Sequence, residues 1–83
     1  MTNIVVWSKD HCGYCTMVKE FLNSKGLPFT ENNIESGSYT IDDLREAAPQ
    51  ARTMPQVFSG KHYVGGYTET VEHFSMNLDG LSL

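Results

Sequence analysis

Two cysteines, Cys12 and Cys15, are the residues of this sequence best suited to chemistry. Cysteine pairs at this spacing bind zinc, form disulfides or exchange thiols with the disulfides of other molecules. The pair follows the short apolar run of residues 4–7 and precedes a segment in which apolar residues recur at helical spacing. A cysteine pair placed between a strand and the helix that follows it indicates thiol–disulfide exchange.

The expected position of Cys12 explains how its sulfur would be activated. We place Cys12 near the N-cap of the helix, where the N–H groups of the first turn, Tyr14 and Cys15 among them, have no partner within the helix. These donors and the helix dipole favour the thiolate over the thiol, and Lys9 lies close enough in sequence to add positive charge. A lower pKa increases the thiolate fraction but weakens the nucleophile, so its main effect is to make Cys12 a good leaving group. We predict that Cys12 attacks and later leaves, and that Cys15 resolves the mixed disulfide.

Two other uses of the pair stay open. A structural zinc site needs four ligands, and the sequence adds only His11, His62 and His73, without a second pair at ligand spacing. A purely structural disulfide across two intervening residues would restrict little chain entropy. We therefore favour the redox interpretation, and we interpret the three histidines as surface residues without a role.

The elements that must position the pair follow the order βαβαββα. Strands are predicted at residues 4–7, 29–34, 56–58 and 62–64, with a glycine-containing turn between the last two. The first helix follows the cysteines and ends before Gly26. The second begins at a capping box formed by Thr40 and Asp43, and the third begins with Thr68 as its N-cap. The order predicts an α/β fold with a mixed four-stranded sheet, parallel in its first half and a hairpin in its second, flanked by three helices.

The apolar spacing also predicts which side chains are buried. In the second helix the apolar face consists of Ile41, Leu44, Ala47 and Ala48, and in the third of Val71, Phe74 and Leu78. We expect Trp7 and Met17 in the core and Tyr14 at the surface.

Composition limits the classes of protein that this chain can belong to. Its 83 residues predict one domain, 1–83, and its net charge of −4 argues against a nucleic-acid partner. No apolar stretch approaches the ~20 residues of a membrane span, and the N-terminus lacks the features of a signal peptide. Two cysteines are too few for a secreted domain held together by disulfides. We therefore expect a cytoplasmic protein with no membrane partner.

Three segments of the chain together resemble the glutaredoxins. They are Trp-Ser-Lys-Asp-His-Cys-Gly-Tyr-Cys at 7–15, Ala-Arg-Thr-Met-Pro-Gln-Val-Phe at 51–58 and Val-Gly-Gly-Tyr-Thr-Glu at 64–69. The resemblance extends over about residues 3–78. It implies a thioredoxin-like fold, glutathione-dependent dithiol–disulfide exchange, and a cis peptide bond between Met54 and Pro55.

The resemblance also implies roles for individual residues. Cys12 matches the nucleophile of the family, and Cys15 matches its resolving cysteine. Glutathione, the expected co-substrate, would be held by Lys9, Tyr14, Met54, Pro55, Gly66, Tyr67 and Thr68. Within this set, the Met54 backbone would pair with the cysteinyl part of glutathione, and residues 66–68 would hold its γ-glutamyl end, since a helix N-terminus suits a carboxylate.

The sequence departs from the family pattern at two places. Gly13 stands where many dithiol members carry proline, and in some glutaredoxins this accompanies a [2Fe–2S] cluster shared by two protomers and glutathione. Cys12 would be the metal ligand in that case, and we expect no other metal site. Thr68-Glu69 replaces the more usual aspartate at the glutamyl end, so Thr68 brings no charge for the glutamyl ammonium, and this weakens the expected affinity for glutathione.

The resulting hypothesis is a monomeric enzyme, a glutathione-dependent disulfide oxidoreductase. Its expected acceptors are protein disulfides and glutathione mixed disulfides, with ribonucleotide reductase as a candidate partner. One alternative is a redoxin reduced by thioredoxin reductase. A second alternative, from another functional class, is an iron–sulfur carrier, which Gly13 favours and Cys15 disfavours.

Overall fold

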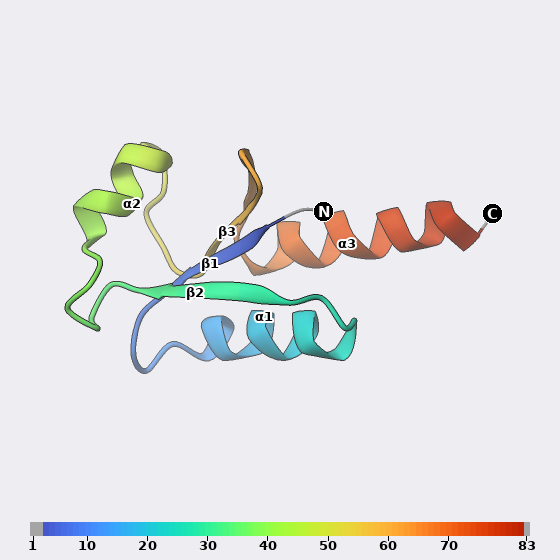
Figure 1. Cartoon of the computed structure of the whole chain (residues 1–83), viewed down its shortest axis with the longest axis horizontal. Helices are drawn as coiled ribbons and strands as arrows, with labels where there is room; N and C mark the ends of the chain where they lie inside the picture. Colours follow the sequence, from blue (N-terminus) through green and yellow to red (C-terminus); the bar gives the residue numbers. More distant parts are fainter. Residues whose placement is uncertain (1–2, 83) are drawn as a thin grey trace.

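The computed structural model describes the backbone of residues 3–82 and the side chains of residues 3–75. No helix in residues 3–82 is long and apolar enough to cross a membrane. The elements, drawn in Figure 1, are β1 (Ile4–Ser8), α1 (Gly13–Ser24), β2 (Phe29–Asn33), α2 (Ile41–Ala47), β3 (Gln56–Ser59), β4 (His62–Gly65) and α3 (Tyr67–Ser82). This confirms the predicted order of strands and helices.

The four strands form one mixed sheet in the order β2-β1-β3-β4. β1 runs parallel to β2 because α1 carries the chain back between them, whereas β3 is antiparallel to both β1 and β4. Trp7, near the end of β1, lies opposite Gln56, the first residue of β3. The loop that follows β1 and the loop that precedes β3 therefore lie at the same end of the sheet, and this brings Cys12 close to Met54.

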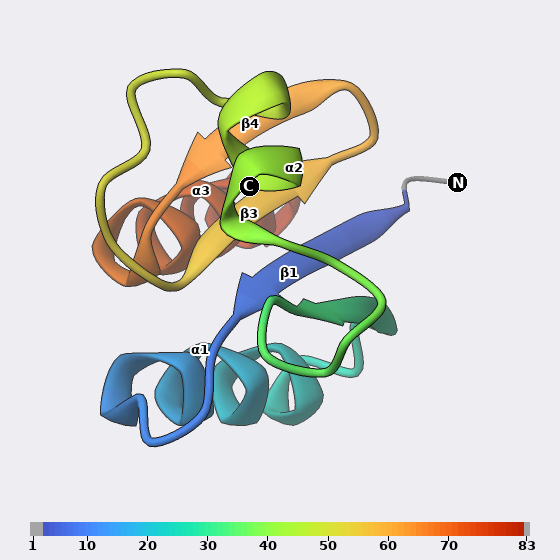
Figure 2. The same ribbon diagram turned by 90° about the vertical axis from the view of Figure 1, so that its left-hand side faces the viewer.

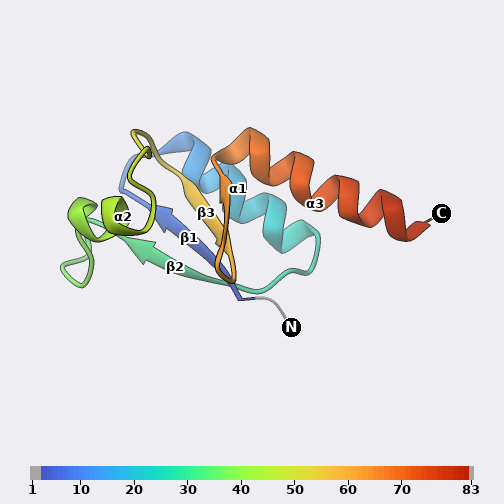
Figure 3. The ribbon, with the colours of Figure 1, turned by 90° about the horizontal axis from the view of Figure 1, so that it is seen from above.

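The two faces of the sheet are covered by different helices. In Figures 2 and 3, α1 and α3 lie on one face and α2 lies on the other. Successive β1 side chains point to opposite faces, so Val6 packs with α1 and α3, whereas Trp7 packs with Leu44 of α2. The larger buried cluster comprises Ile4, Val6, Val18, Leu22, Val57 and Phe74, and the smaller one comprises Trp7, Leu44, Ala48 and Ala51.

The predicted helix ends agree with the structure where local sequence determines them. Thr40 and Asp43 exchange both bonds of a capping box at the start of α2. Gly26, with a φ of 69°, follows the C-cap of α1 in the left-handed conformation that glycine adopts without steric cost. Trp7 is buried and Tyr14 is exposed, as predicted.

Three local predictions are wrong. Met17 was expected in the core but is 42% exposed, because the buried side of α1 is the narrow stripe of Cys15, Val18 and Leu22. Ala47, expected on the buried face of α2, is exposed at the end of that short helix. Thr68 is not an N-cap, because α3 begins at Tyr67 and Thr68 therefore lies within the first turn of the helix. The side chain of Leu78 lies outside the described residues.

Candidate active site

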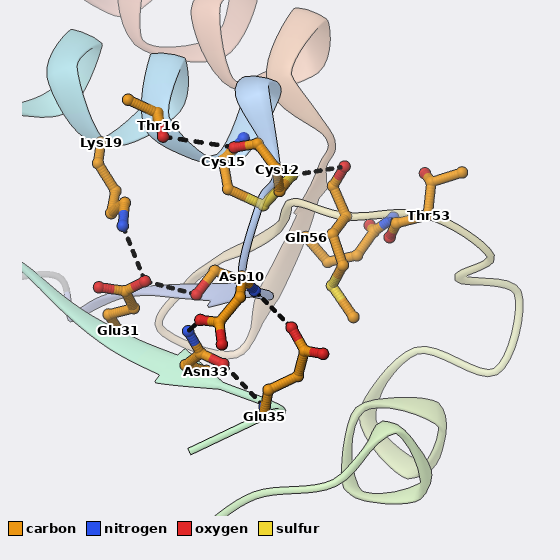
Figure 4. Close-up of a disulfide and its surroundings, with 12 residues drawn as sticks. Asp10, Cys12, Cys15, Thr16, Lys19, Glu31, Asn33, Glu35, Thr53 and Gln56 are labelled. Atoms are coloured by element: carbon orange, nitrogen blue, oxygen red, sulfur yellow. Dashed lines mark hydrogen bonds and ion pairs between the residues drawn. A yellow bond between two sulfur atoms is a disulfide. The ribbon is translucent and has the colours of Figure 1, made fainter.

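Cys12 and Cys15 form a disulfide at the N-terminus of α1, with their Cα atoms 5.2 Å apart (Figure 4). Cys12 is the N-cap residue, and its Sγ accepts a hydrogen bond of 3.2 Å from the N–H of Cys15. Cys15 is only 2% exposed, whereas Cys12 is half-buried. Solvent and substrates therefore reach the sulfur of Cys12 more readily, and the first turn of α1 is placed to stabilise negative charge on it.

The segment before β3 supplies the second wall of the site. The Met54–Pro55 peptide bond is cis, which confirms the prediction. The carbonyl oxygen of Met54 lies 3.8 Å from Cys12 Sγ. Gln56, itself buried, donates from its side-chain amide to the carbonyl of Thr53 at 2.8 Å and accepts from the Tyr63 hydroxyl. These bonds tie the segment to the sheet and hold the Met54 carbonyl beside the sulfur.

A hollow of about 360 Å³ adjoins this wall, and we call it the Met54 hollow. The aromatic rings of Tyr14 and Tyr67 lie in contact at one side of it, with centroids 5.7 Å apart. Its lining residues are Tyr14, Thr53, Met54, Pro55, Gly66, Tyr67, Thr68 and Glu69. Six of the seven residues expected to hold glutathione are thus together in one hollow.

The N-terminus of α3 forms the far end of the Met54 hollow. Glu69, in the first turn, accepts a hydrogen bond of 2.9 Å from the Gly66 N–H through its side-chain carboxylate. This bond explains why the helix starts before Thr68: a glycine N-cap is tolerated, and the carboxylate three residues later satisfies its N–H. The carboxylate of Glu69 therefore lies where the backbone of residues 66–68 faces the hollow.

A second hollow, of about 420 Å³, lies on the other flank of Cys12, and we call it the Lys19 hollow. It is lined by Lys9, Asp10, His11, Cys12, Gly13, Cys15, Thr16, Lys19 and Asn33. Lys9 is exposed and belongs to this hollow. Lys9 is therefore the one expected glutathione residue that does not line the Met54 hollow.

An ion pair lies beside the Lys19 hollow. Lys19 Nζ donates to Glu31 Oε2 at 2.9 Å, and the hydroxyl of Ser8 donates to the same oxygen at 2.5 Å. The bond from Ser8, followed by that from Lys19, lowers the pKa of the Glu31 carboxyl. Glu31 is consequently a carboxylate, and Lys19 has a fixed partner.

The histidines do not gather at the cysteines. His62 of β4 and His73 of α3 stack on each other with ring centroids 5.5 Å apart, a contact that sequence spacing gave no reason to expect. His11 precedes Cys12 with a φ of 55°. Among the described residues, no group of three or more histidine, cysteine, aspartate or glutamate side chains is placed to hold a metal ion.

Comparison with known proteins identifies the family. The glutaredoxin family model matches residues 4–64. The chain belongs to the glutaredoxin family. It is therefore an enzyme of thiol–disulfide exchange, and its thioredoxin-like fold is that of the family, as the resemblance implied.

Individual relatives support this assignment. The chain is 35% identical over 80 residues to the N-acetyl-S-hydroxy-L-cysteine reductase of Bacillus subtilis, covering 94% of this chain and 85% of the relative. It is 39% identical over 71 residues to a glutaredoxin of Vernicia fordii, covering 82% and 67%. The crystal structure of the buckwheat glutaredoxin–glutathione complex superposes with a TM-score of 0.76 at 29% identity, covering 92% of this chain and 71% of the other.

Sequence reasoning missed several residues that line the two hollows. Thr53 and Glu69 border the Met54 hollow, and each is adjacent in sequence to an expected site residue. Thr16 and Lys19 border the Lys19 hollow. For Lys19 a signal was present, since it follows Cys15 by four residues and so lies on the same side of α1.

Proposed function

We propose that this glutaredoxin uses glutathione to reduce protein disulfides and glutathione mixed disulfides. The observation that carries the proposal is the position of Cys12, whose sulfur lies at the first turn of α1 and 3.8 Å from the Met54 carbonyl. A sulfur in this position is activated by the helix N-terminus, and the Met54 residue beside it lines a hollow of suitable size for a tripeptide thiol.

The reaction proceeds through two exchanges at Cys12. The Cys12 thiolate attacks a substrate disulfide, a bond forms between the two sulfurs, and the substrate leaves as a thiolate. With a protein substrate, the Cys15 thiolate then attacks Cys12, releases the second substrate thiol and leaves the Cys12–Cys15 disulfide. Two molecules of glutathione return the enzyme to its dithiol form: the first opens the disulfide at Cys12, and the second displaces Cys12 as oxidised glutathione forms.

Glutathione occupies the Met54 hollow in this proposal. Its cysteinyl backbone pairs with the Met54 backbone, which places its sulfur beside Cys12. Its γ-glutamyl carboxylate lies at the N-terminus of α3, at Tyr67 and Thr68, where free N–H groups and the helix dipole favour an anion. The buckwheat relative, whose crystal structure is that of a glutathione complex, supports glutathione as the ligand.

The proposal also includes the oligomeric state of the protein, its location in the cell and its protein acceptor. We expect a monomeric protein in the cytoplasm, and ribonucleotide reductase is the first protein acceptor to assay. Support for these points comes from the family resemblance and from the composition of the chain.

A second candidate activity is the reduction of small cysteine sulfenic acids. The name of the Bacillus subtilis relative, an N-acetyl-S-hydroxy-L-cysteine reductase, favours it, because that likeness covers 94% of this chain. The Cys12 thiolate attacks the sulfenic sulfur, the S–O bond breaks, and the hydroxide leaves as water after taking a proton. Cys15 then displaces the reduced cysteine as its thiol and closes the enzyme disulfide.

The test compares Cys12→Ser and Cys15→Ser with the parent in three assays: a protein disulfide, a glutathione mixed disulfide and N-acetyl-S-hydroxycysteine. Cys12→Ser is expected to lose all turnover. Cys15→Ser is expected to lose protein disulfide reduction and keep mixed disulfide reduction, which needs only one protein thiol. An active Cys12→Ser enzyme would show that the two roles are reversed.

The reductant is tested separately. Oxidised enzyme is mixed with glutathione, or with thioredoxin reductase and NADPH, and disulfide opening is followed. Opening by glutathione is the expected result, whereas opening by the reductase alone would refute the proposed reductant. A brown protein after anaerobic purification would point instead to an iron–sulfur carrier.

A further inference from the structure

Lys19, which is ion-paired with Glu31, lines the same hollow as the resolving cysteine and is not used in the exchange steps above. Lys19 follows Cys15 by one turn of α1, so the two side chains share one side of the helix. Both line the Lys19 hollow. Figure 4 shows Lys19 reaching from α1 to Glu31 on β2.

The two members of the ion pair differ in their relation to the hollow. Lys19 lines the hollow, whereas Glu31 is not among its lining residues. Ser8, buried at the end of β1, holds Glu31 from the side of the sheet through the same oxygen that Lys19 contacts. Lys19 thus lines the hollow together with both cysteines, whereas Glu31, which holds its ammonium group at 2.9 Å, is not a lining residue.

Other charged groups also line or border the Lys19 hollow. From the loop before α1, Lys9 and Asp10 face the hollow with opposite charges, and His11 lies beside them. The Asp10 carboxylate accepts a hydrogen bond from the Asn33 side chain, and Glu35 accepts one from the Asp10 N–H. Lys19 is the only charged residue of α1 among those that line the hollow within the described residues.

We propose that Lys19, fixed by Glu31, stabilises the thiolate that Cys15 becomes each time the enzyme disulfide opens. When a glutathione thiolate attacks Cys12, a bond forms between their sulfurs, the Cys12–Cys15 bond breaks, and its electron pair stays on Cys15. Cys15 is 2% exposed, so water solvates this charge poorly, and a neighbouring ammonium favours the thiolate. In the reverse sense, the same ammonium helps Cys15 to lose its proton before it resolves a mixed disulfide. The inference rests on the proposed function for its role in turnover, but its electrostatic part does not.

The first test measures the Cys15 thiol without glutathione. In a Cys12→Ser background Cys15 is the only cysteine, and its titration is followed by the ultraviolet absorbance of the thiolate. Lys19→Met is expected to raise its pKa by about 0.2 to 0.7, the range for a partly exposed charge. Lys19→Gln should give the same rise, and Lys19→Arg should restore most of the parent value.

Lys25→Met is the matched control. It removes the same charge just beyond the far end of α1, where Lys25 is exposed and contacts the Phe21 ring. It is expected to leave the pKa of Cys15 unchanged. Equal pKa values in Lys19→Met and the parent background, or the same rise in Lys25→Met, would overturn the proposal even if glutathione proves to be the reductant.

The second test is kinetic and uses the enzyme with both cysteines. The ratio of protein disulfide turnover, which needs Cys15, to mixed disulfide turnover is expected to fall about two- to fivefold in Lys19→Met. It should stay at the parent value in Lys25→Met. A ratio that falls equally in both variants would reflect the loss of net charge and would count against Lys19.

Discussion

Gly65 ends β4, just before the start of α3, and a side chain at this position would disturb the start of that helix. Its φ is +125°, a conformation that other residues adopt only under strain. A Cβ added there would lie 2.9 Å from both Cβ and Cγ of Glu69. Gly65→Ala would therefore strain the backbone and push aside the side chain that caps Gly66.

The two effects set the expected loss of stability. Backbone strain of this kind costs about 1 to 3 kcal/mol, and losing the bond from the Gly66 N–H to Glu69 adds about 0.5 to 1.5 kcal/mol. For a domain of this size, 1 kcal/mol shifts Tm by about 4 to 8 °C, so Tm should fall by at least about 6 °C. Because residues 66–68 line the Met54 hollow, the KM for glutathione should rise as well.

Thermal unfolding followed by circular dichroism tests this expectation, with Gly13→Ala as the control. Gly13 is the first residue of α1, its φ is not in the left-handed region, and a Cβ there meets nothing within 4 Å. Alanine at that position should leave stability unchanged or raise it by up to about 1 kcal/mol. If Gly65→Ala unfolded at the same temperature as the parent, the reasoning from φ and the Glu69 contact would be wrong.

The parts of the fold and site that could be predicted depend on residues close together in the chain. The capping box of Thr40 and Asp43 needs only four residues, and Cys12 and Cys15 are placed by the boundary between β1 and α1. The parallel pairing of β1 with β2 and the hairpin of β3 and β4 follow from the lengths of the connections between them. The cis bond before Pro55 is different, because the low frequency of cis proline gives no reason to expect it and the prediction came from the family resemblance.

The errors arise where neighbours distant in sequence decide the outcome. Met17 is apolar and lies beside the buried stripe of α1, but the sheet and α3 cover only the Cys15 side of that helix. The Thr68 error is different, because it comes from a local contact: Thr68 is a good N-cap by residue type, yet Gly66 takes that position since the Glu69 carboxylate, three residues later, reaches its N–H.

The arrangement of two separate hollows near Cys12 could not be predicted from the sequence. Lys9 is only three residues from Cys12, and this proximity suggested that it belongs with the glutathione residues. In the structure it borders the opposite flank, because the chain turns between β1 and α1. The contacts of Ser8 and Lys19 with Glu31 depend on β2 pairing with β1 in parallel register beneath α1, and no local pattern encodes that arrangement.

Two further predictions concern charged groups. Lys9→Ala should raise the KM for glutathione by no more than about fivefold, since an exposed charge contributes about 0.2 to 1 kcal/mol to binding. Added salt should remove the difference between the two proteins. An unchanged KM at low salt would show that Lys9 does not contribute to glutathione binding. Glu31→Gln should destabilise the fold at neutral pH by about 0.2 to 1 kcal/mol, because Gln keeps the bond from Ser8 but loses the charge that pairs with Lys19. The folded state lowers the pKa of Glu31 below the ordinary value of a glutamate carboxyl, so its carboxylate stabilises the fold above the unfolded pKa, and this contribution disappears as pH falls through the folded pKa. Urea unfolding of both proteins should therefore differ at neutral pH and converge in acid, whereas a constant difference at every pH would mean that the Lys19–Glu31 charge pair does not contribute.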